Sequence, residues 1–299
     1  MNNVLVTGAN GFIGSALVNK MISNGISVVA VDISFEHSHL IESDLLTKVT
    51  LDLNSDVIFD EHIPMYGYDA FYHLAWTGVN GPNKANPIVQ LENAKLTVKC
   101  AEFAKKTGCK KFLCAGTIAE RAVESLPDLK NVNGGMMYGI AKDCTHKILE
   151  TYCKNIGLNF VWMQFSNIYG PLNKTGNLIS YTIGELIANK EASFGPAVQP
   201  YDFIYVDDLI DAEYKIGTCE NKHDFCYIGS GKPRLLKDYL FEIGELCNKK
   251  ELIKIGIRKD DGIKYDYSMF DNTALCDDIG DYISTDFTAG ILKTLESYE

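Results

Sequence analysis

The chain has 299 residues, 46% of them hydrophobic, which is enough to bury the core of one large α/β domain or of two smaller ones. We expect one large interwoven unit. The formal net charge of −11 argues against a nucleic-acid or anionic-membrane partner, because the average field repels phosphate. Any phosphate group that binds therefore needs a local site.

The opening segment has no basic region followed by a long apolar stretch, and no later apolar run reaches the ~18 residues of a membrane span. We therefore expect a cytoplasmic protein. The nine cysteines are an odd number without CxxC spacing, which favours buried thiols of a reducing compartment over a disulfide framework. His37 and His39 lack accompanying ligands, so no metal site is predicted.

The first half of the chain alternates short apolar segments with amphipathic ones, which indicates βαβ units and a parallel sheet. The expected strands are Val4–Thr7, Ser27–Val31, Lys48–Leu51, Ala70–Leu74, Lys111–Ala115 and Phe160–Phe165. The expected helices are Gly11–Ser23, Pro87–Lys106 and Tyr138–Asn155. The fold class predicted is a Rossmann-type doubly wound parallel sheet.

The pattern changes after Asn167. We expect helices at Leu178–Asn189, Asp207–Ile216 and Leu235–Cys247, a strand at Asp202–Val206, and a late sheet strand near Tyr227–Gly231. The predicted division is a dinucleotide-binding domain of residues 1–166, to which parts of 202–230 return. A smaller, interleaved substrate lobe would then comprise residues 167–201 and 231–299.

Glycines at positions 8, 11 and 14 lie between the first expected strand and the first expected helix. The first permits a tight turn, the second lets the backbone approach a pyrophosphate, and the third allows close packing of helix on strand. The phosphate then binds at the helix N-terminus. The spacing is GxxGxxG rather than GxGxxG, and a glycine-rich turn without ligand is the alternative.

Asp32 ends the second strand, where a carboxylate accepts hydrogen bonds from ribose hydroxyls and repels a 2′-phosphate. Ile33, Ser34, Phe35 and Glu36 follow without a cation, so NAD is favoured over NADP. Asp52 and Leu53 follow the third strand; they either reach the adenine or form a turn.

Tyr138 and Lys142 are four residues apart in an expected helix, which places both side chains on one face. The spacing also fits an ordinary half-exposed helix face. Its significance comes from the order of the glycine loop, Asp32, a hydroxyl at Thr117 just after the fifth strand, and then this pair. A neighbouring ammonium and a positive nicotinamide both favour the phenolate of Tyr138, which suits it as acid and base at a carbinol oxygen.

With these residues the chain resembles the extended short-chain dehydrogenases/reductases, specifically the nucleotide-sugar epimerase, dehydratase and reductase group. Further matching motifs are His73-Leu74-Ala75-Trp76, Asn93, Ser166-Asn167-Ile168-Tyr169-Gly170-Pro171 and Asp202-Phe203-Ile204-Tyr205-Val206-Asp207-Asp208. The resemblance covers nearly the whole length.

The resemblance implies that Tyr138 is the general acid/base, that Lys142 binds the nicotinamide ribose, and that Thr117 orients the reacting oxygen. It implies cofactor contacts at Gly8, Asn10, Gly11, Phe12, Ile13, Gly14, Asp32, Asp52, Leu53, Leu74, Ala75, Asn93, Tyr138 and Lys142. It implies substrate contacts at Trp76, Thr117, Asn167, Asn177, Leu178 and Arg258, with a nucleotide-diphosphate sugar as partner. Arg258 also fits an exposed arginine in a basic stretch.

The segment after Thr117 departs from the family pattern. Ile118 and Ala119 cannot supply the acid and base that a 4,6-dehydratase needs, and Glu120 comes one or two positions too late. A common diphosphate-binding arginine is replaced by Tyr201.

Three functions remain. We favour net oxidation or reduction at the sugar C4, in activated-sugar biosynthesis for surface polysaccharide. The alternatives are an NAD-dependent 4-epimerase and a non-enzymatic dinucleotide-binding protein. The helices Pro87–Lys106 and Tyr138–Asn155 resemble those that pair two subunits, so we expect a homodimer.

Overall fold

The computed structural model describes residues 1–54, 59–128, 133–173, 176–260 and 262–298, and the side chains of 124–128 are left out of the description. Among these residues, none of the helices has both the length and the apolar character that a membrane span requires.

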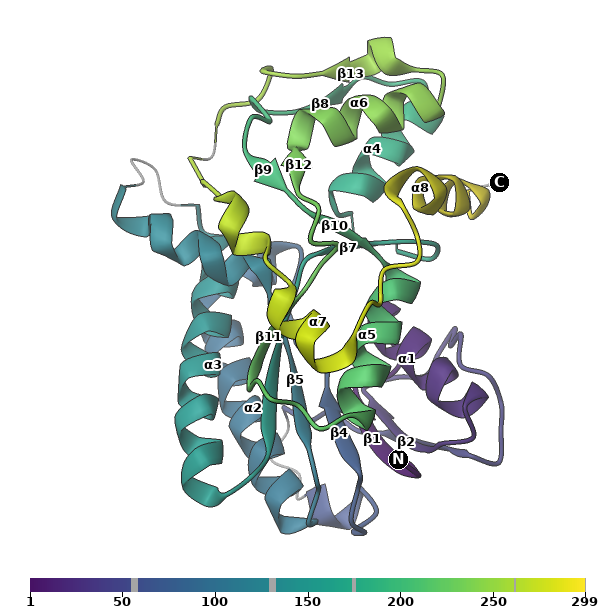
Figure 1. Ribbon diagram of the computed structural model, residues 1–299, viewed down its shortest axis with the longest axis vertical. Coiled ribbons are helices and arrows are strands. Elements are labelled where there is room, and N and C mark those ends of the chain that lie inside the picture. The colour runs from purple at the N-terminus through teal and green to yellow at the C-terminus, as the bar shows by residue number, and fades with distance from the viewer. Residues whose placement is uncertain (55–58, 129–132, 174–175, 261, 299) are drawn as a thin grey trace.

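A seven-stranded sheet in the order β11-β6-β5-β4-β1-β2-β3 forms the lower half of the molecule (Figure 1). Every strand pair in it is parallel. The strands are β1 (Asn3–Thr7), β2 (Ser27–Asp32), β3 (Leu46–Thr50), β4 (Ala70–His73), β5 (Phe112–Thr117), β6 (Phe160–Phe165) and β11 (Phe225–Ile228). The order reverses beside β1, so the predicted doubly wound Rossmann-type sheet is confirmed.

Helices cover both faces of this sheet (Figure 1). One core packs α2 (Pro87–Lys106) and α3 (Met136–Ile156) against one face through residues such as Leu96 and Leu149. The other packs α1 (Phe12–Ser23) and α5 (Val206–Thr218) against the opposite face through Leu17 and Leu209. Burial on both faces explains why β1, β4 and β6 are buried at nearly every position and mostly apolar, rather than alternating.

A smaller lobe sits beyond the carboxyl ends of the strands (Figure 1). Its elements are β7 (Asn167–Tyr169), α4 (Leu178–Ile187), β8 (Ala192–Ser193), β9 (Pro200–Tyr201), β10 (Phe203–Tyr205), β12 (Arg234–Leu235), α6 (Leu236–Leu246) and β13 (Ile253–Lys254). They form three two-stranded sheets, β10-β7, β12-β9 and β13-β8. Short 3₁₀ segments are η1 (Phe59–Glu61), η2 (Pro82–Ala85), η3 (Ile118–Asp128), η4 (Lys250–Leu252) and η5 (Tyr267–Phe270).

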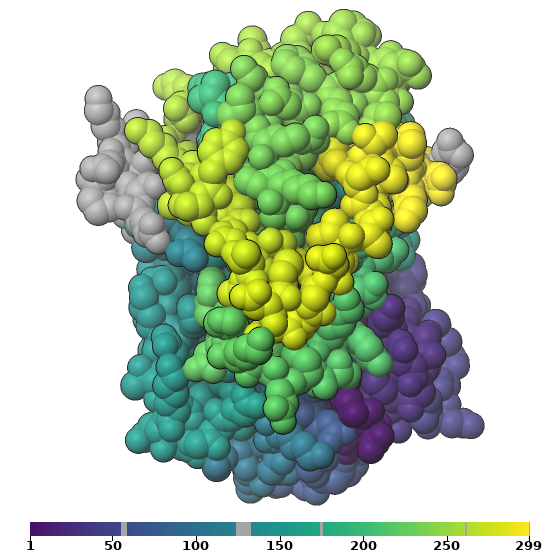
Figure 2. Space-filling model, in the orientation of Figure 1, coloured from purple at the N-terminus to yellow at the C-terminus, as the bar shows by residue number. Residues whose placement is uncertain are grey.

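The C-terminal segment, with α7 (Thr273–Ile279) and α8 (Phe287–Glu296), crosses the front of the molecule between the two halves (Figure 2). It is anchored to α5 by the buried carboxylate of Asp208. That carboxylate accepts hydrogen bonds from the Ser284 N–H at 3.0 Å, the Ser284 hydroxyl at 2.6 Å and the Thr285 N–H at 3.1 Å. The chain end therefore ties the lobe to the sheet.

The expected strands and long helices are all present, with ends shifted by a few residues. Two differences have physical causes. The predicted strand Asp202–Val206 is the shorter β10, which pairs with β7 outside the main sheet, and α5 already begins at Val206. The short helices α7 and α8 were not predicted, because their apolar faces are completed only by packing on the rest of the molecule.

A carboxyl group without a partner is buried on α5. Glu213 is fully buried, and neither of its oxygens has a hydrogen-bond partner among the described residues. Burial raises its pKa well above the usual value. The folded state therefore holds this proton at pH values where the unfolded chain has lost it, so this group's contribution to stability falls as the pH rises above ~4.3.

We predict that Glu213→Gln stabilises the protein increasingly with pH. The variant removes the free-energy cost of keeping the Glu213 carboxyl neutral in the folded protein. Between the pKa of the unfolded chain and the pKa of the folded protein, this cost grows by about 1.4 kcal/mol for each pH unit. Urea unfolding at pH 5 and pH 8 measures it, with Asp211→Asn, at a half-buried position of the same helix that pairs with Lys20, as control. An equal gain at both pH values would contradict the prediction.

Candidate active site

A cleft of about 1070 Å³ lies at the carboxyl edge of the sheet, below the lobe. Parallel strands end at the same edge, so residues far apart in the sequence meet there. Sixteen predicted contacts line it: Gly8, Asn10, Gly11, Phe12, Ile13, Gly14, Asp32, Leu74, Ala75, Trp76, Thr117, Tyr138, Lys142, Asn167, Asn177 and Leu178. The structure thus brings together most of the residues selected from the sequence.

The turn from β1 to α1 is built on close approaches that only glycine allows. Gly8 has a positive φ of 71°, and a Cβ there would lie 2.8 Å from the backbone nitrogen of Ala75. A Cβ at Gly14 would lie 2.8 Å from the carbonyl carbon of Gly8. Gly11 caps α1 without any side-chain hydrogen bond, so the first N–H groups of the helix are left for an anion in the cleft.

The turn and the end of β2 together fit a dinucleotide. The Asp32 carboxylate accepts from the Asn10 N–H at 2.8 Å and from the Ile33 N–H at 2.7 Å, so it is fixed beside the glycine turn. The buried Oδ1 of Asn10 has no partner among the described residues and lines the same cleft. A free acceptor, a fixed carboxylate and an uncapped helix match the hydroxyls and the pyrophosphate of such a ligand.

Thr117, Tyr138 and Lys142 meet at the other end of this cleft. Thr117 ends β5, and the other two residues lie one turn apart on α3. Lys142 is 4% exposed; its ammonium donates to the backbone oxygen of Ala115 and lies 3.8 Å from the centre of the Trp76 ring. The Trp76 ring in turn packs edge-on against Tyr138.

Burial and charge act in opposite directions on this pair. Burial raises the pKa of Tyr138, and its hydrogen bond with Thr117 lowers it. Burial lowers the pKa of Lys142, and the negative charge of Glu120 raises it. The phenol therefore needs the positive charge of Lys142 if it is to act as a base near neutral pH.

Asn93 was predicted to contact the cofactor, but it does not line the cleft. Its side chain clamps the backbone of Thr77, accepting from the N–H at 2.8 Å and donating to the carbonyl at 2.8 Å. Its neighbour His73 is equally buried and bonds Thr7 at 2.8 Å and Thr97 at 3.1 Å. Both residues hold the loop after β4 in place rather than touching a ligand.

Three other predicted contacts also lie outside the cleft. Asp52 is exposed and accepts from the Asn54 N–H at 3.0 Å, as in a turn, while Leu53 is buried in the core. The Arg258 guanidinium donates to the Tyr181 hydroxyl at 2.7 Å and stacks on that ring, which directs it away from the cleft. Asp52 thus lies in a turn and Arg258 is exposed, as in the two alternatives, and their ligand contacts stay predictions.

The two predicted asparagines of the lobe line the cleft, and their side chains already make hydrogen bonds within the protein. Asn177 caps α4 by accepting from the Ser180 N–H at 2.9 Å and donates to the Ile168 carbonyl at 3.0 Å. Asn167 donates to the Asp202 carbonyl at 3.1 Å. Both residues thereby fix the backbone at the substrate side.

Lys84 was not selected from the sequence. It lines the cleft, with its ammonium 5.5 Å from the centre of the Tyr138 ring. It lies in η2, within a segment that is rich in Gly, Asn and Pro and has no periodic pattern. Its position beside the phenol of Tyr138 therefore could not be predicted from the sequence. Further lining residues that the sequence did not mark as contacts are Ser166, Asn173, Tyr201 and Phe203.

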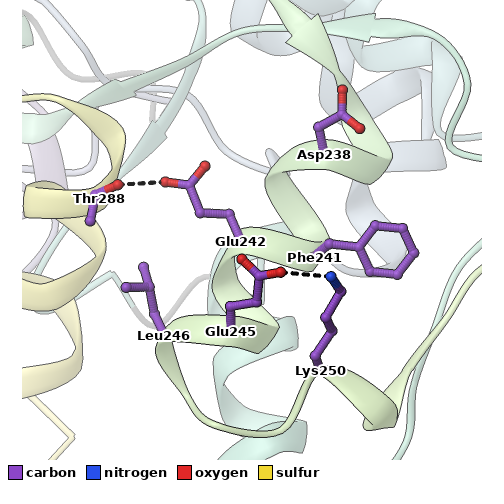
Figure 3. A pocket seen from close by; sticks show the side chains of 7 residues that line it. All are labelled: Asp238, Phe241, Glu242, Glu245, Leu246, Lys250 and Thr288. Atoms are coloured by element: carbon purple, nitrogen blue, oxygen red, sulfur yellow. Dashed lines mark hydrogen bonds and ion pairs between the residues drawn. The ribbon is translucent and has the colours of Figure 1, made fainter.

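A second hollow, of about 590 Å³, lies on the lobe between α6 and α8 (Figure 3). Its polar groups are largely paired with one another: Thr288 donates to Glu242 at 2.6 Å and Lys250 to Glu245 at 2.6 Å. None of the predicted contacts lines it. The chemistry therefore belongs to the cleft at the sheet edge.

A doubly wound sheet, a glycine turn on a helix N-terminus and a Thr–Tyr–Lys group in one cleft define a dinucleotide-dependent oxidoreductase-type enzyme. The model of the NAD dependent epimerase/dehydratase family matches residues 4–225, and the chain belongs to this family. It is therefore an NAD-dependent enzyme of the extended short-chain dehydrogenase/reductase type.

Curated relatives catalyse more than one reaction. The chain is 28% identical over 251 residues to a putative UDP-glucose 4-epimerase of Methanocaldococcus jannaschii, with 80% of each chain covered. It is 28% identical over 275 residues to a dTDP-4-dehydro-6-deoxyglucose reductase of Escherichia coli, with 84% of each covered. A UDP-N-acetylglucosamine 4-epimerase of Methanobrevibacter ruminantium M1, solved in complex with UDP-N-acetylmuramic acid, superposes with a TM-score of 0.81 at 21% identity over 99% of this chain and 98% of that one.

We predict that Gly14→Ala weakens NADH binding by at least about 10-fold, because its Cβ would displace the Gly8 turn from the pyrophosphate. Gly184→Ala on α4 is the matched control, since a Cβ there meets nothing within 4 Å. NADH fluorescence titration measures binding, and circular dichroism verifies the fold. Equal affinity of the two variants would refute the assigned role of the turn.

Proposed function

We propose that this enzyme oxidises or reduces the sugar C4 of a nucleotide-diphosphate sugar, with net turnover of NAD. The observation that carries the proposal is the convergence of Thr117, Tyr138 and Lys142 on the cleft that the dinucleotide-binding turn also lines. When bound there, NAD would accept or supply the hydride.

In this proposal Tyr138 moves the proton at the sugar oxygen, taking it during oxidation and returning it during reduction. Thr117 hydrogen-bonds Tyr138 and lies where it can orient the same oxygen. Lys142 binds the nicotinamide ribose and supplies the positive charge that favours the phenolate.

The residues after Thr117 argue against dehydration as the reaction. Ile118 is buried and apolar, and Ala119 carries no ionisable group. Glu120 is 4% exposed and is absent from the lining of the cleft, so it does not reach a substrate. The acid and base that elimination requires are therefore missing at this position.

NAD rather than NADP is proposed as the cofactor used. Asp32 and Glu36 both line the cleft where the adenosine ribose would lie, and their carboxylates would repel a 2′-phosphate. On the lobe side Trp76, Asn167, Asn177 and Leu178 line the space that we assign to the nucleotide-diphosphate sugar. A role in activated-sugar supply for surface polysaccharide belongs to the same proposal.

A 4-epimerase is the second candidate, and the acidic ribose site supports it. An epimerase oxidises and re-reduces the same sugar, so it has no need of the NADPH pool. Incubation with a panel of NDP-hexoses and 4-keto-6-deoxy-NDP-hexoses separates the two. A net change in NADH absorbance supports the C4 oxidoreductase, whereas sugar inversion by NMR without that change supports the epimerase and overturns the first proposal.

Tyr138→Phe should lower turnover by at least on the order of 10²-fold, because it removes the proton donor and acceptor while leaving the ring. NADH should still bind, since the glycine turn and Asp32 are untouched. Steady-state kinetics and NADH titration of the same preparation test this. Turnover near that of the wild type would remove Tyr138 from the mechanism.

The exposed faces of α2 and α3 support the proposed homodimer. Leu91 is 62% exposed and Ile88 65% exposed on α2, and Ile148 is 45% exposed on α3. Such side chains on adjacent helices are suited to burial against a second copy.

We predict that the wild type is a dimer and that Leu91→Lys with Ile148→Lys is a monomer at micromolar concentration. Light scattering after size exclusion gives both masses. Ile257→Lys is the control, since Ile257 is 69% exposed on the lobe, away from α2 and α3. A monomeric wild type, or a double variant that remains a dimer, would contradict the proposed interface.

A further inference from the structure

A buried carboxyl group lies behind the Thr–Tyr–Lys group, outside the cleft. Glu120 belongs to η3, which follows β5 directly, and is 4% exposed. Its Oε1 accepts from the Thr117 N–H at 2.6 Å, and its Oε2 from the Trp162 indole at 3.1 Å and the Gln164 amide at 2.9 Å. All three partners are donors. Burial raises the pKa of this carboxyl group above its usual value, while the three donors and the charge of Lys142 lower it. An ionised carboxylate only accepts hydrogen bonds, so these donors favour its charged form.

The surrounding backbone is shaped to admit this carboxylate. A Cβ at Gly116 would lie 2.8 Å from its Oε1, and still closer to the Trp162 indole nitrogen. A Cβ at Gly139, next to Tyr138 on α3, would lie 3.0 Å from the carbonyl carbon of Ala119. Two glycines therefore let β5, η3 and α3 converge on Glu120.

One tryptophan links the carboxylate to the buried ammonium. Trp162 is fully buried; its indole N–H is bonded to Glu120, and the centre of its ring lies 5.7 Å from the Lys142 ammonium. Lys142 has no salt bridge among the described residues; its ammonium contacts the Ala115 carbonyl and the faces of two tryptophans. Glu120 therefore supplies negative charge to this cation across the buried Trp162 ring.

Other titratable groups around this layer are few. From α3 they are Tyr138, Lys142 and His146, whose ring stacks on Trp162 at 4.9 Å. From the adjoining strands and segment they are His73 and Cys114, which both interact with Lys142, and Arg121, whose Nε donates to Gln164 at 3.1 Å. Glu120 is the acidic member of this set.

We propose that Glu120 is a positioning residue of the active site: its ionised carboxylate is the counter-charge that keeps Lys142 protonated, and it fixes the Thr117 backbone for proton transfer. The proposal rests on the hydride chemistry at the sugar C4 proposed above, because that chemistry, with net turnover of NAD or in epimerisation, needs a tuned Tyr138. Removing the negative charge favours deprotonation of both Lys142 and Tyr138.

The pH dependence of kcat/KM tests the charge. For Glu120→Gln we expect both limbs of the profile to move to lower pH by about half a unit or more, as for a lost neighbouring charge. Glu120→Asp retains the charge at a changed distance, so its limbs should stay near those of the wild type even where kcat falls. Limbs of Glu120→Gln that coincide with the wild type would overturn the proposal, since a purely structural role lowers kcat without moving them.

Fluorescence of the free protein tests the same charge without turnover. The chain has two tryptophans, so Trp76→Phe leaves Trp162 alone, bonded to Glu120. Its emission should change in an acid transition, below neutral pH, that Glu120→Gln abolishes. His146→Asn in the same background identifies any transition of the stacked imidazole. A Glu120-dependent transition above neutral pH, or none, would show that the carboxyl is not an ionised counter-charge at working pH and would overturn the proposal.

The two proposals fail differently. If the wild type turns over no nucleotide sugar, the proposed function fails while the fluorescence titration still reports the charge of Glu120. If the wild type is active and Tyr138→Phe is not, but Glu120→Gln leaves the pH profile unmoved, only the role of Glu120 fails.

Discussion

The ammonium of Lys142 is the constraint on which the rest of the site depends. A buried unpaired charge is among the most costly features of a protein interior, and in the proposed mechanism it lies beside a cofactor that carries positive charge in its oxidised form. The structure offsets that cost with a carbonyl from β5, the faces of two tryptophans and a carboxylate one layer behind. These partners come from β5, β6, the loop after β4 and η3 directly after β5, so the carboxyl ends of the parallel sheet assemble the environment of the charge.

The need to hold this charge in a fixed environment also explains why buried side chains with hydrogen bonds lie around the cleft. His73, Asn93 and Gln90 are each nearly inaccessible. Gln90 accepts from the Trp76 indole and Asn93 bonds the Thr77 backbone, while His73 at the end of β4 bonds Thr7 of β1 and Thr97 of α2. Burial lowers the pKa of His73 to about 3, with a further contribution from Lys142, so it adds no second positive charge. On the lobe side Asp202 accepts from Tyr227 at 2.7 Å, which ties β11 of the sheet to the segment that faces the substrate.

The fold, and the meeting of the glycine turn with Asp32 in one cleft, could be predicted because their signals are local. A glycine turn between a strand and a helix, and a carboxylate at the next strand end, are determined within about 30 residues of one βαβ unit. Asn93 and Arg258 were placed by resemblance, which gives a position along the chain but not the direction of the side chain. Asn93 turns to the Thr77 backbone and Arg258 to Tyr181. The role of Glu120 was out of reach for another reason: its partners Trp162 and Gln164 lie 42 and 44 residues away, on a different strand.

The acidity of the chain also constrains how it recognises phosphate. Among the described lining residues the lysines are Lys84 and Lys142, and both lie at the Tyr138 end of the cleft. Neither belongs to the glycine turn. The pyrophosphate of the dinucleotide is therefore left to backbone N–H groups and the dipole of α1, whose first turn carries no acidic residue. These backbone N–H donors carry no net charge, and Gly8 and Gly14 fix their positions. They therefore attract a phosphate group only when it is within hydrogen-bonding distance. A chain with a net charge of −11 can thus bind a doubly charged linkage without a basic surface, because recognition depends on the geometry of one turn rather than on the field of the whole molecule.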